Sequence, residues 1–451
     1  MKRGLWLTAM FLLACIGSWA ADWPQFRGES ASGVGAGVNP PVQWDGVKGT
    51  NILWKTEVPG LAISSPIVWG DTIYLTTAIS SDKTQKFRTG LYGDTDSSKD
   101  LSPHVWKVLA YDKKMGKLLW EQTAHEGVPR TKRHPKSSQA SATPVTNGKV
   151  VVAWFGSEGL YAYSDRGKLL WKKDLGLQTA GWFFDPDSEW GVGSSPVIYR
   201  DTVIVLCDRQ KDSFIAAFSL KDGREVWRTA RAEIPSWATP AIVQGEKRTE
   251  LVTNAAKAIR GYDPAIGKEL WTLGPNSEIP APTPVSGHGL IFVTSGYAPL
   301  QPIYAIRTGF SGDLTIRDGK ESSAAIAWSK KAGGSYLPTP LLYGDLLYVV
   351  NNSGILAAYD AKSGNRVYQQ RIEGGGSFTA SPVAAAGHLY FPTEDGDVYV
   401  VKAGPKYEFV AKNPMGEPML STPAWAGDIL IIRGERHLFA VAQGASQSPK
   451  P

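Results

Sequence analysis

Short apolar segments follow one another along the whole chain, and turn-forming residues separate them. Residues 72–75 and 346–349 are typical, because each is an apolar run that directly follows a Gly-Asp turn. Long stretches with the period of about 3.6 residues that marks an amphipathic helix are absent. Short runs bounded by Gly, Pro, Asn and Asp are typical of β-strands, so the pattern predicts an all-β protein.

A Ser-Pro or Thr-Pro dipeptide opens each unit of an internal repeat. Away from three longer gaps, the dipeptides recur every 41 to 44 residues. Each leads into an apolar strand, a turn, a second strand, a third strand that often contains Ala-Tyr-Asp, and a fourth strand. Four strands in about 40 residues is the period of a propeller blade. The eight openings begin at Ser65, Thr143, Ser195, Thr239, Thr283, Thr339, Ser381 and Thr422.

An aromatic residue marks the fourth strand of seven units. The last unit has three strands, and the segment 52–55 near the N-terminus supplies a fourth strand with Trp54. We therefore predict an eight-bladed β-propeller of four-stranded antiparallel blades, whose ring is closed by the N-terminal strand. Closure removes the exposed sheet edges of an open array. The other aromatic ends are Trp120, Trp171, Trp227, Trp271, Trp328, Tyr368 and Phe409.

The spacing Ala-x-Asp-x-x-x-Gly-x-x-x-Trp suits packing between blades. The Gly permits a tight turn, and the Trp is large enough to fill the space beside a neighbouring blade. We therefore predict structural docking, not ligand stacking, for Trp54, Trp120, Trp171, Trp227, Trp271 and Trp328.

The unit resembles the PQQ-like propeller repeat, on residues 110–120 and, with Tyr368 in place of Trp, on residues 358–368. The segment 22–28, Asp-Trp-Pro-Gln-Phe-Arg-Gly, is similar to the start of many exported PQQ-like bacterial proteins. These proteins are likened to BamB-type outer-membrane assembly lipoproteins. The resemblance covers the mature chain and implies the fold, but fold alone does not fix function.

PQQ-dependent dehydrogenases use the same propeller, and their alcohol-oxidising members place a Cys-Cys pair against the quinone. They also need calcium held by carboxylate and amide side chains. This sequence has no Cys-Cys pair and no segment that aligns with the calcium ligands. We therefore expect no cofactor, with PQQ plus calcium as the alternative.

The first 21 residues have the anatomy of a secretory signal peptide, with a positive start, an apolar run and small residues before the cleavage site. We expect an exported protein of the periplasm or cell envelope, with one domain over 22–445 and a disordered tail over 446–451. A second interpretation stays open, because residues 12–15 fit a loose lipobox in which Cys15 carries a lipid anchor. No later segment is apolar enough to span a membrane.

The charge argues against a nucleic-acid partner, because a net charge of +6 is small for 451 residues. The densest basic stretch, residues 130–136, is a Pro-containing loop, whereas nucleic-acid binders gather charge on one face. We expect a monomer.

Binding in propellers uses loops at the mouth of the central channel. The connections 182–191 and 231–237 combine aromatic and charged residues in a way that suits a protein or glycan interface. The candidate mouth residues are Trp190, Asp208, Arg231, Glu233, Trp237, Tyr336 and Arg433. The alternative for each is a role in covering the ring or in a structural hydrogen bond.

An insertion over residues 80–103 of the first unit carries acidic residues at alternate positions, Asp94, Asp96 and Asp100. Calcium loops begin this way, but this one lacks the Gly and the final Glu of such loops, so it is a weak calcium candidate. No catalytic motif is present. We therefore predict a non-catalytic protein-binding scaffold of the envelope, with a PQQ-dependent dehydrogenase or a carbohydrate-binding propeller as alternatives.

Overall fold

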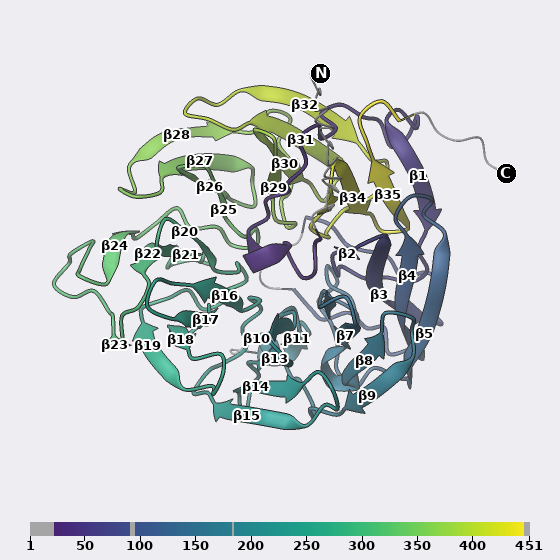
Figure 1. Cartoon of the computed structure of the whole chain (residues 1–451), viewed down its shortest axis with the longest axis horizontal. Coiled ribbons are helices and arrows are strands. Elements are labelled where there is room, and N and C mark those ends of the chain that lie inside the picture. The colour runs from purple at the N-terminus through teal and green to yellow at the C-terminus, as the bar shows by residue number, and fades with distance from the viewer. Residues whose placement is uncertain (1–21, 91–94, 183–184, 446–451) are drawn as a thin grey trace, which may run out of the picture.

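The computed structural model describes residues 22–90, 95–182 and 185–445, which form a ring of eight sheets around a central axis (Figure 1). The four repeat strands of each blade pair antiparallel, so the predicted all-β, eight-bladed propeller is confirmed. The predicted ring closure is also present, since β1 (Ile52–Glu57) pairs with β35 (His437–Val441). The predicted signal peptide, Cys15 and the predicted tail lie outside the described residues.

The first four blades follow one another without crossovers. Their strands are β2 (Ile67–Trp69), β3 (Thr72–Ser80), β4 (His104–Asp112) and β5 (Leu118–Gly127) in blade 1, β6 (Val145–Thr146), β7 (Val150–Trp154), β8 (Leu160–Ser164) and β9 (Leu169–Lys173) in blade 2, β12 (Val197–Tyr199), β13 (Thr202–Cys207), β14 (Phe214–Ser219) and β15 (Glu225–Ala230) in blade 3, and β16 (Ala241–Gln244), β17 (Thr249–Thr253), β18 (Ile259–Tyr262) and β19 (Glu269–Leu273) in blade 4.

The remaining blades repeat this order, and β1 is the outer strand of blade 8. Their strands are β20 (Val285–Gly287), β21 (Leu290–Thr294), β22 (Ile303–Arg307) and β24 (Ile326–Lys330) in blade 5, β25 (Leu341–Tyr343), β26 (Leu346–Val350), β27 (Ile355–Asp360) and β28 (Arg366–Arg371) in blade 6, β29 (Val383–Ala385), β30 (His388–Pro392), β31 (Asp397–Lys402) and β32 (Phe409–Pro414) in blade 7, and β33 (Ala424–Ala426), β34 (Ile429–Arg433), β35 and β1 in blade 8.

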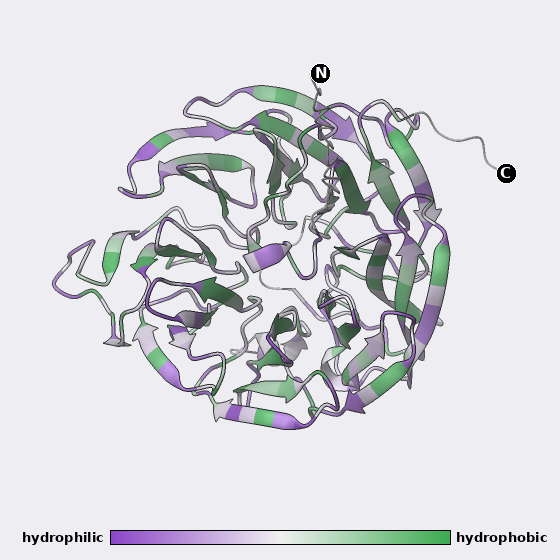
Figure 2. Cartoon of the chain, in the orientation of Figure 1, coloured by the Kyte–Doolittle hydropathy of each residue, from purple (hydrophilic) through white to green (hydrophobic). Residues whose placement is uncertain are grey.

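Hydrophobic residues concentrate on the inner strands of the blades, while the outer strands mix polar and apolar residues (Figure 2). The inner strands are buried because they lie between neighbouring blades on both faces. Outside the blades, β10 (Gly181–Trp182) and β11 (Asp185–Glu189) form a separate two-stranded sheet, and η1 (Glu29–Ala31) and η2 (Gly156–Glu158) are short helical turns.

The fourth-strand tryptophans lie between neighbouring blades. Each pairs across the sheet with a small residue of the third strand, as Trp120 does with Ala110. Five of the six predicted docking tryptophans donate their indole N–H to a carbonyl of the next blade, at 2.9–3.2 Å. These bonds run from Trp54 to Lys113, Trp120 to Asp165, Trp171 to Leu220, Trp227 to Pro264 and Trp328 to Ala361.

The glycine of the repeat motif is required by this docking. Gly364 has a φ of +71°, and a Cβ added there would lie 2.5 Å from Cδ2 of Trp328. Gly223 is similar, with a φ of +70° and a Cβ position 2.8 Å from Cδ2 of Trp171. Any other residue would be strained in its backbone and would collide with the indole of the preceding blade.

Three fourth strands depart from this plan. In blade 6, Tyr368 stands opposite Ala358 and its hydroxyl has no hydrogen-bond partner within the described residues. The Trp271 indole donates to the Glu250 carboxylate of its own blade at 2.7 Å. Beside it, β23 (Gly312–Asp313) pairs parallel to β19 as a fifth strand of blade 4. In blade 7 the register pairs Val400 with Ala411, so Ala411 occupies the docking position. The expectation that Phe409 is the equivalent aromatic end is therefore wrong.

The Ser-Pro and Thr-Pro openings form a ring of hydrogen bonds around the channel. The backbone N–H of each opening residue donates to the side-chain hydroxyl of the next, for example from Ser65 to Thr143 at 2.9 Å. Seven of the eight links are present, including Thr422 to Ser65 across the ring closure. At the remaining position the Thr283 hydroxyl has no hydrogen-bond partner within the described residues.

The N-terminal segment closes one end of the channel. It follows the first strands of several blades, with a bond from Thr146 N–H to Pro24 O and another from Gly35 N–H to Ala384 O. The short η1 lies across the centre of the ring in Figure 1. Arg27 is fully buried and donates to the carbonyls of Pro340 and Pro382, at 3.0 and 2.7 Å. Burial lowers the pKa of Arg27 to about 9.

Candidate functional site

The other end of the channel, which we call the mouth, holds a central cavity of about 220 Å³. Phe26 reaches the cavity from the N-terminal segment that closes the opposite end. All eight ring hydroxyls line it, and residues of the connections between blades line its upper part. The site is therefore a closed-ended well that opens on one face of the propeller.

An aromatic and aliphatic group at the mouth, the mouth cluster, covers one side of this well. Trp190 packs against Trp237 with ring centroids 5.5 Å apart, and Tyr297 packs against Tyr336 at the same distance. Ile279 completes the packing with Leu337. These side chains come from five different connections, so the cluster ties together the loops of blades 2 to 6.

Hydrogen bonds fix the two tryptophans of the mouth cluster. Trp237 Nε1 donates to Gly191 O at 2.8 Å, and Trp190 Nε1 lies 3.5 Å from Thr95 O in the insertion of blade 1. Glu189, next to Trp190, accepts the Ala180 N–H. Burial raises the pKa of Glu189 to about 7. The indoles are thus held in place before any ligand arrives.

The blade 1 insertion reaches across the mouth to blades 7 and 8. Gly90 N–H donates to the Glu394 carboxylate at 2.8 Å, and Phe87 N–H donates to Glu435 at 3.0 Å. Glu394 also forms a buried ion pair with Lys136, with N and O 2.7 Å apart. Burial lowers the pKa of Lys136, the neighbouring Glu394 acting against this. Sequence reasoning missed this pair because its members are far apart in the chain.

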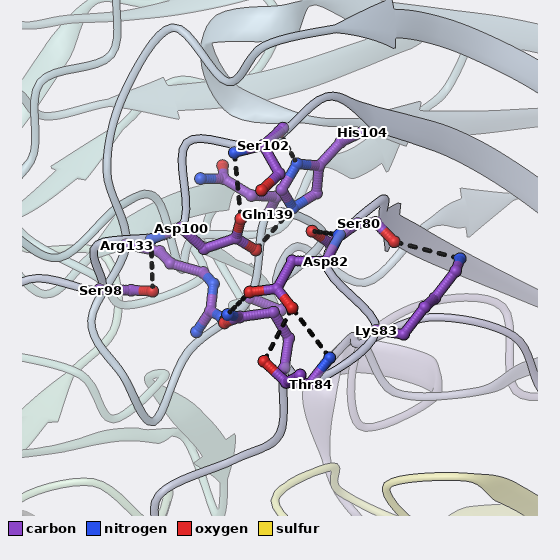
Figure 3. Close-up of polar contacts among 12 residues, drawn as sticks. Ser80, Asp82, Lys83, Thr84, Ser98, Asp100, Ser102, His104, Arg133 and Gln139 are labelled. Atoms are coloured by element: carbon purple, nitrogen blue, oxygen red, sulfur yellow. Dashed lines mark hydrogen bonds and ion pairs between the residues drawn. The ribbon is translucent and has the colours of Figure 1, made fainter.

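Two acidic residues of the insertion have separate partners in Figure 3, since Asp82 accepts from Thr84 and Asp100 accepts from Ser102. Asp100 faces His104, with Oδ2 and Nε2 3.5 Å apart, while its Oδ1 accepts the Ser102 N–H at 3.1 Å. Asp94 lies outside the described residues. Across the described part of the chain, three or more His, Cys, Asp or Glu side chains nowhere group as metal ligands would. Calcium binding by Asp94, Asp96 and Asp100 therefore gains no support from the arrangement.

Three of the predicted mouth residues, Trp190, Trp237 and Tyr336, line the central cavity. Asp208 and Arg231, which follow β13 and β15 of blade 3, instead form a buried ion pair with each other. Its Oδ1 and Nε atoms are 2.7 Å apart. Burial lowers the pKa of Arg231, but the Asp208 carboxylate outweighs this and raises it overall. The pair is satisfied within the protein and does not line the cavity.

Glu233 and Arg433 are also placed away from the cavity. Glu233 forms an ion pair with Arg260 and accepts the Lys257 N–H at 2.9 Å. Arg433 is buried in blade 8 and donates to the Thr76 carbonyl and the Ser64 hydroxyl, both at 2.8 Å. Burial lowers its pKa to about 10. Polar residues at strand ends thus tie blades together, which is the alternative role considered from the sequence.

A second hollow, the interblade pocket, lies between blades 5 and 6 and measures about 640 Å³. Tyr336 lines both this pocket and the central cavity, so the two hollows adjoin. Sequence reasoning did not find the pocket. The signals that could have indicated it are Ala357 in a position that is bulky in most other blades, and the Gly-Gly pair at residues 333–334.

A family model described as "Outer membrane protein assembly factor BamB" matches residues 106–309 and 254–405. The tetrathionate hydrolase of Acidithiobacillus ferrooxidans is 22% identical over 364 residues, which is 75% of this chain. The match covers 64% of that relative, so the chain spans less than two thirds of the relative's length.

Solved structures share the fold at low sequence identity. BamB from Moraxella catarrhalis superposes with a TM-score of 0.53 at 14% identity, covering 83% of this chain and 99% of that one. Quinohemoprotein alcohol dehydrogenase from Comamonas testosteroni gives 0.60 at 11% identity, covering 96% of this chain and 82% of that one. Such likenesses show the propeller and leave the activity open. No helix within the described residues is long and apolar enough to cross a membrane.

Proposed function

Because the chain belongs to the PQQ-like propeller family described as outer membrane protein assembly factor BamB, we propose that it is a non-catalytic, protein-binding scaffold of the cell envelope. The signal-peptide pattern of residues 1–21 supports export. The family description supports a partner in outer-membrane protein assembly. The mouth is the face that receives the partner.

The observation that carries this proposal is the difference between the two ends of the ring. The N-terminal segment covers one end, whereas the other presents a well lined by aromatic side chains and hydroxyls. Aromatic anchors at the centre of an interface contribute most of its binding energy. Leu101 and Leu177, on loops at the mouth end, each expose 49% of their surface. They would extend the contact surface around the well.

Dehydrogenation with PQQ and calcium does not fit the residues present. The described side chains that line the central cavity include no carboxylate and no amide, whereas calcium takes carboxylate and amide oxygens as ligands. Glu394 is the ion-pair partner of the cavity-lining Lys136, and its carboxylate is occupied by Lys136, Thr379 and Gly90. We therefore derive no chemistry through this cofactor.

Site-specific photo-crosslinking in cells tests the scaffold. A photoreactive residue at Leu177, on the mouth face, should give a discrete adduct with an outer-membrane protein or a protein of its assembly. The same residue at Met115, exposed by 66% in a turn at the closed end, is the matched control and should give none. Equal adducts at both positions, or none at Leu177 and Leu101, would exclude the mouth as the docking face.

A further inference from the structure

The interface between blades 5 and 6 is hollow at a place where other interfaces are filled. Ala357 of β27 pairs across the sheet with Val349 and Gln369, and all three line the interblade pocket. The corresponding third-strand residues of the other blades, read from the same register, are Leu109, Tyr161, Ala216, Arg260, Tyr304, Tyr399 and Phe439. Only blades 3 and 6 have a small residue there.

Blade 3 fills the resulting space from its neighbour, whereas blade 6 does not. Trp154, the last residue of β7, packs beside Ala216 in the core between blades 2 and 3. Blade 5 has Thr294 at the position of Trp154, since both residues pair with the first residue of the third strand. Neither blade 5 nor blade 6 therefore has a bulky side chain at these two positions.

The wall of the pocket on the side of blade 5 is backbone. A Cβ added at Gly334 would lie 2.2 Å from Ser295 O, and one at Gly296 would lie 2.4 Å from Tyr336 N. The two loops thus touch without side chains between them, and any larger residue would force them apart. This close contact makes the wall rigid and keeps the hollow open.

Apart from Arg371, the polar side chains that line the pocket are neutral hydrogen-bonding groups above an apolar floor. Val349, Ile355 and Ala357 form the floor. The amides are those of Gln301, Asn351, Asn352 and Gln369, and none of the lining residues is a carboxylate. Asn351 Oδ1 accepts the Ile355 N–H at 2.9 Å, which leaves its amide N–H groups for a ligand.

The Tyr359 hydroxyl is a second unused group. Its ring stacks on Trp328 in the core, with the residue 5% exposed. The hydroxyl has no hydrogen-bond partner within the described residues, although it lines the pocket. The hydroxyl is open to the pocket, so it can donate a hydrogen bond to a ligand there or accept one from it.

We propose that the interblade pocket binds a neutral oligosaccharide. Pyranose rings present apolar C–H faces, which suit the Val349–Ala357 floor, and hydroxyls that both donate and accept, as side-chain amides do. About 640 Å³ lies within the usual range of about 300–1,000 Å³ for small-molecule sites. Tyr336 leads from this pocket to the aromatic rings of the mouth cluster, where a further sugar ring would stack.

An extended peptide suits the pocket less well. Peptides that add to a sheet use the free N–H and C=O groups of an edge strand. The wall formed by blade 6 is instead the face of a sheet, whose strands β26, β27 and β28 are already paired with each other. Recognition there has to come from side chains, and these are mainly neutral amides and hydroxyls with Arg371 as the one charged group.

Calorimetric titration of the mature chain with cellohexaose, chitohexaose, maltohexaose and laminarihexaose tests the proposal. At least one should bind, and Ala357→Leu, which fills the hollow with the side chain that blade 1 has there, should weaken it about tenfold or more. Tyr359→Phe and Gln369→Ala should each weaken binding about threefold or more. Lys172→Ala, at the position of Gln369 in blade 2, is the matched control and should leave binding unchanged.

Three results would overturn the proposal. One is no heat of binding with any of the four sugars while circular dichroism reports a folded propeller. Another is undiminished binding to Ala357→Leu with an unchanged melting temperature. The third is selective binding of uncharged nonapeptides that Ala357→Leu abolishes. None of these bears on crosslinking at Leu177, so this proposal and the scaffold proposal can fail separately.

Discussion

The interfaces between blades 2 and 3 and between blades 5 and 6 have the same tryptophan docking, but they differ in the half that lies nearer the mouth. In both, a fourth-strand tryptophan donates to a carbonyl of the next blade at 2.9 Å, from Trp171 to Leu220 and from Trp328 to Ala361. Towards the mouth, Trp154 fills the first interface, whereas the second contains the interblade pocket.

The comparison shows how a repeat can keep its geometry and still create a site. The docked half sets the spacing of the blades, because each indole is fixed by a hydrogen bond and by the glycine beneath it. The half nearer the mouth is then free to vary, since its filling does not set the ring. A site arises where both blades have small residues.

The largest expected effect is at the filled interface. Trp154 is 1% exposed, so Trp154→Ala should lower the free energy of unfolding by about 3 kcal/mol or more, through lost burial and a new cavity. Thr294→Ala, at the same position in blade 5, should lower it by only about 1 kcal/mol, because it removes one buried methyl and a hydroxyl that is already unpaired. Urea denaturation followed by circular dichroism measures both, and equal losses would contradict the comparison.

Replacing the docking glycine by alanine should lower the free energy of unfolding by a similar amount at both interfaces. Gly223→Ala and Gly364→Ala each place a Cβ within 3 Å of an indole, at backbone φ values of +70° and +71°. Both should lose about 2–3 kcal/mol. Gly344→Ala, at a φ of +60° with open space around it, is the control and should lose about 1 kcal/mol in the same denaturation experiment. If Gly364→Ala left the free energy of unfolding unchanged, docking would not be what holds blades 5 and 6 together.

Enlarging the small third-strand residue should destabilise the interface between blades 2 and 3 but not the interface between blades 5 and 6. Ala216→Leu forces a larger side chain against Trp154 and should cost about 1–3 kcal/mol. Ala357→Leu enters the hollow and should change stability by less than about 0.5 kcal/mol. Thermal unfolding of the two variants side by side measures the difference. A destabilised Ala357→Leu would show that the pocket cannot take the side chain.

The ring was predictable because its signals are local and repeated. Each Ser-Pro or Thr-Pro opening and each Gly-x-x-x-Trp unit recurs at a nearly fixed period, and the missing fourth strand of the last unit pointed to Trp54. The failure at Phe409 has the same origin. Phe409 lies near the expected place in the sequence, but the register of β32 puts Ala411 opposite Val400.

The sites were less predictable, because they depend on missing bulky side chains and on contacts between residues that lie far apart in the sequence. Trp190, Trp237 and Tyr336 are conspicuous in the sequence and do line the cavity. Asp208 and Arg231 are as conspicuous, yet they neutralise each other inside the ring. The interblade pocket lies beside Ala357, whose small size, like that of Thr294 at the position of Trp154, attracts attention only after the blades are compared at equivalent positions.

The last expected effect concerns pH and distinguishes the mouth cluster from the interblade pocket. Glu189, beside Trp190, has a pKa raised to about 7 by burial, so the folded state keeps a proton that the unfolded state releases near its ordinary value of 4.5. Stability should therefore fall as pH rises from 4.5 to 7, and then level off. Glu189→Gln should remove this part of the pH dependence of the melting temperature. The interblade pocket has no carboxylate lining it, so sugar binding there should stay constant over the same range. A pH profile that Glu189→Gln leaves unchanged would assign the effect to another group.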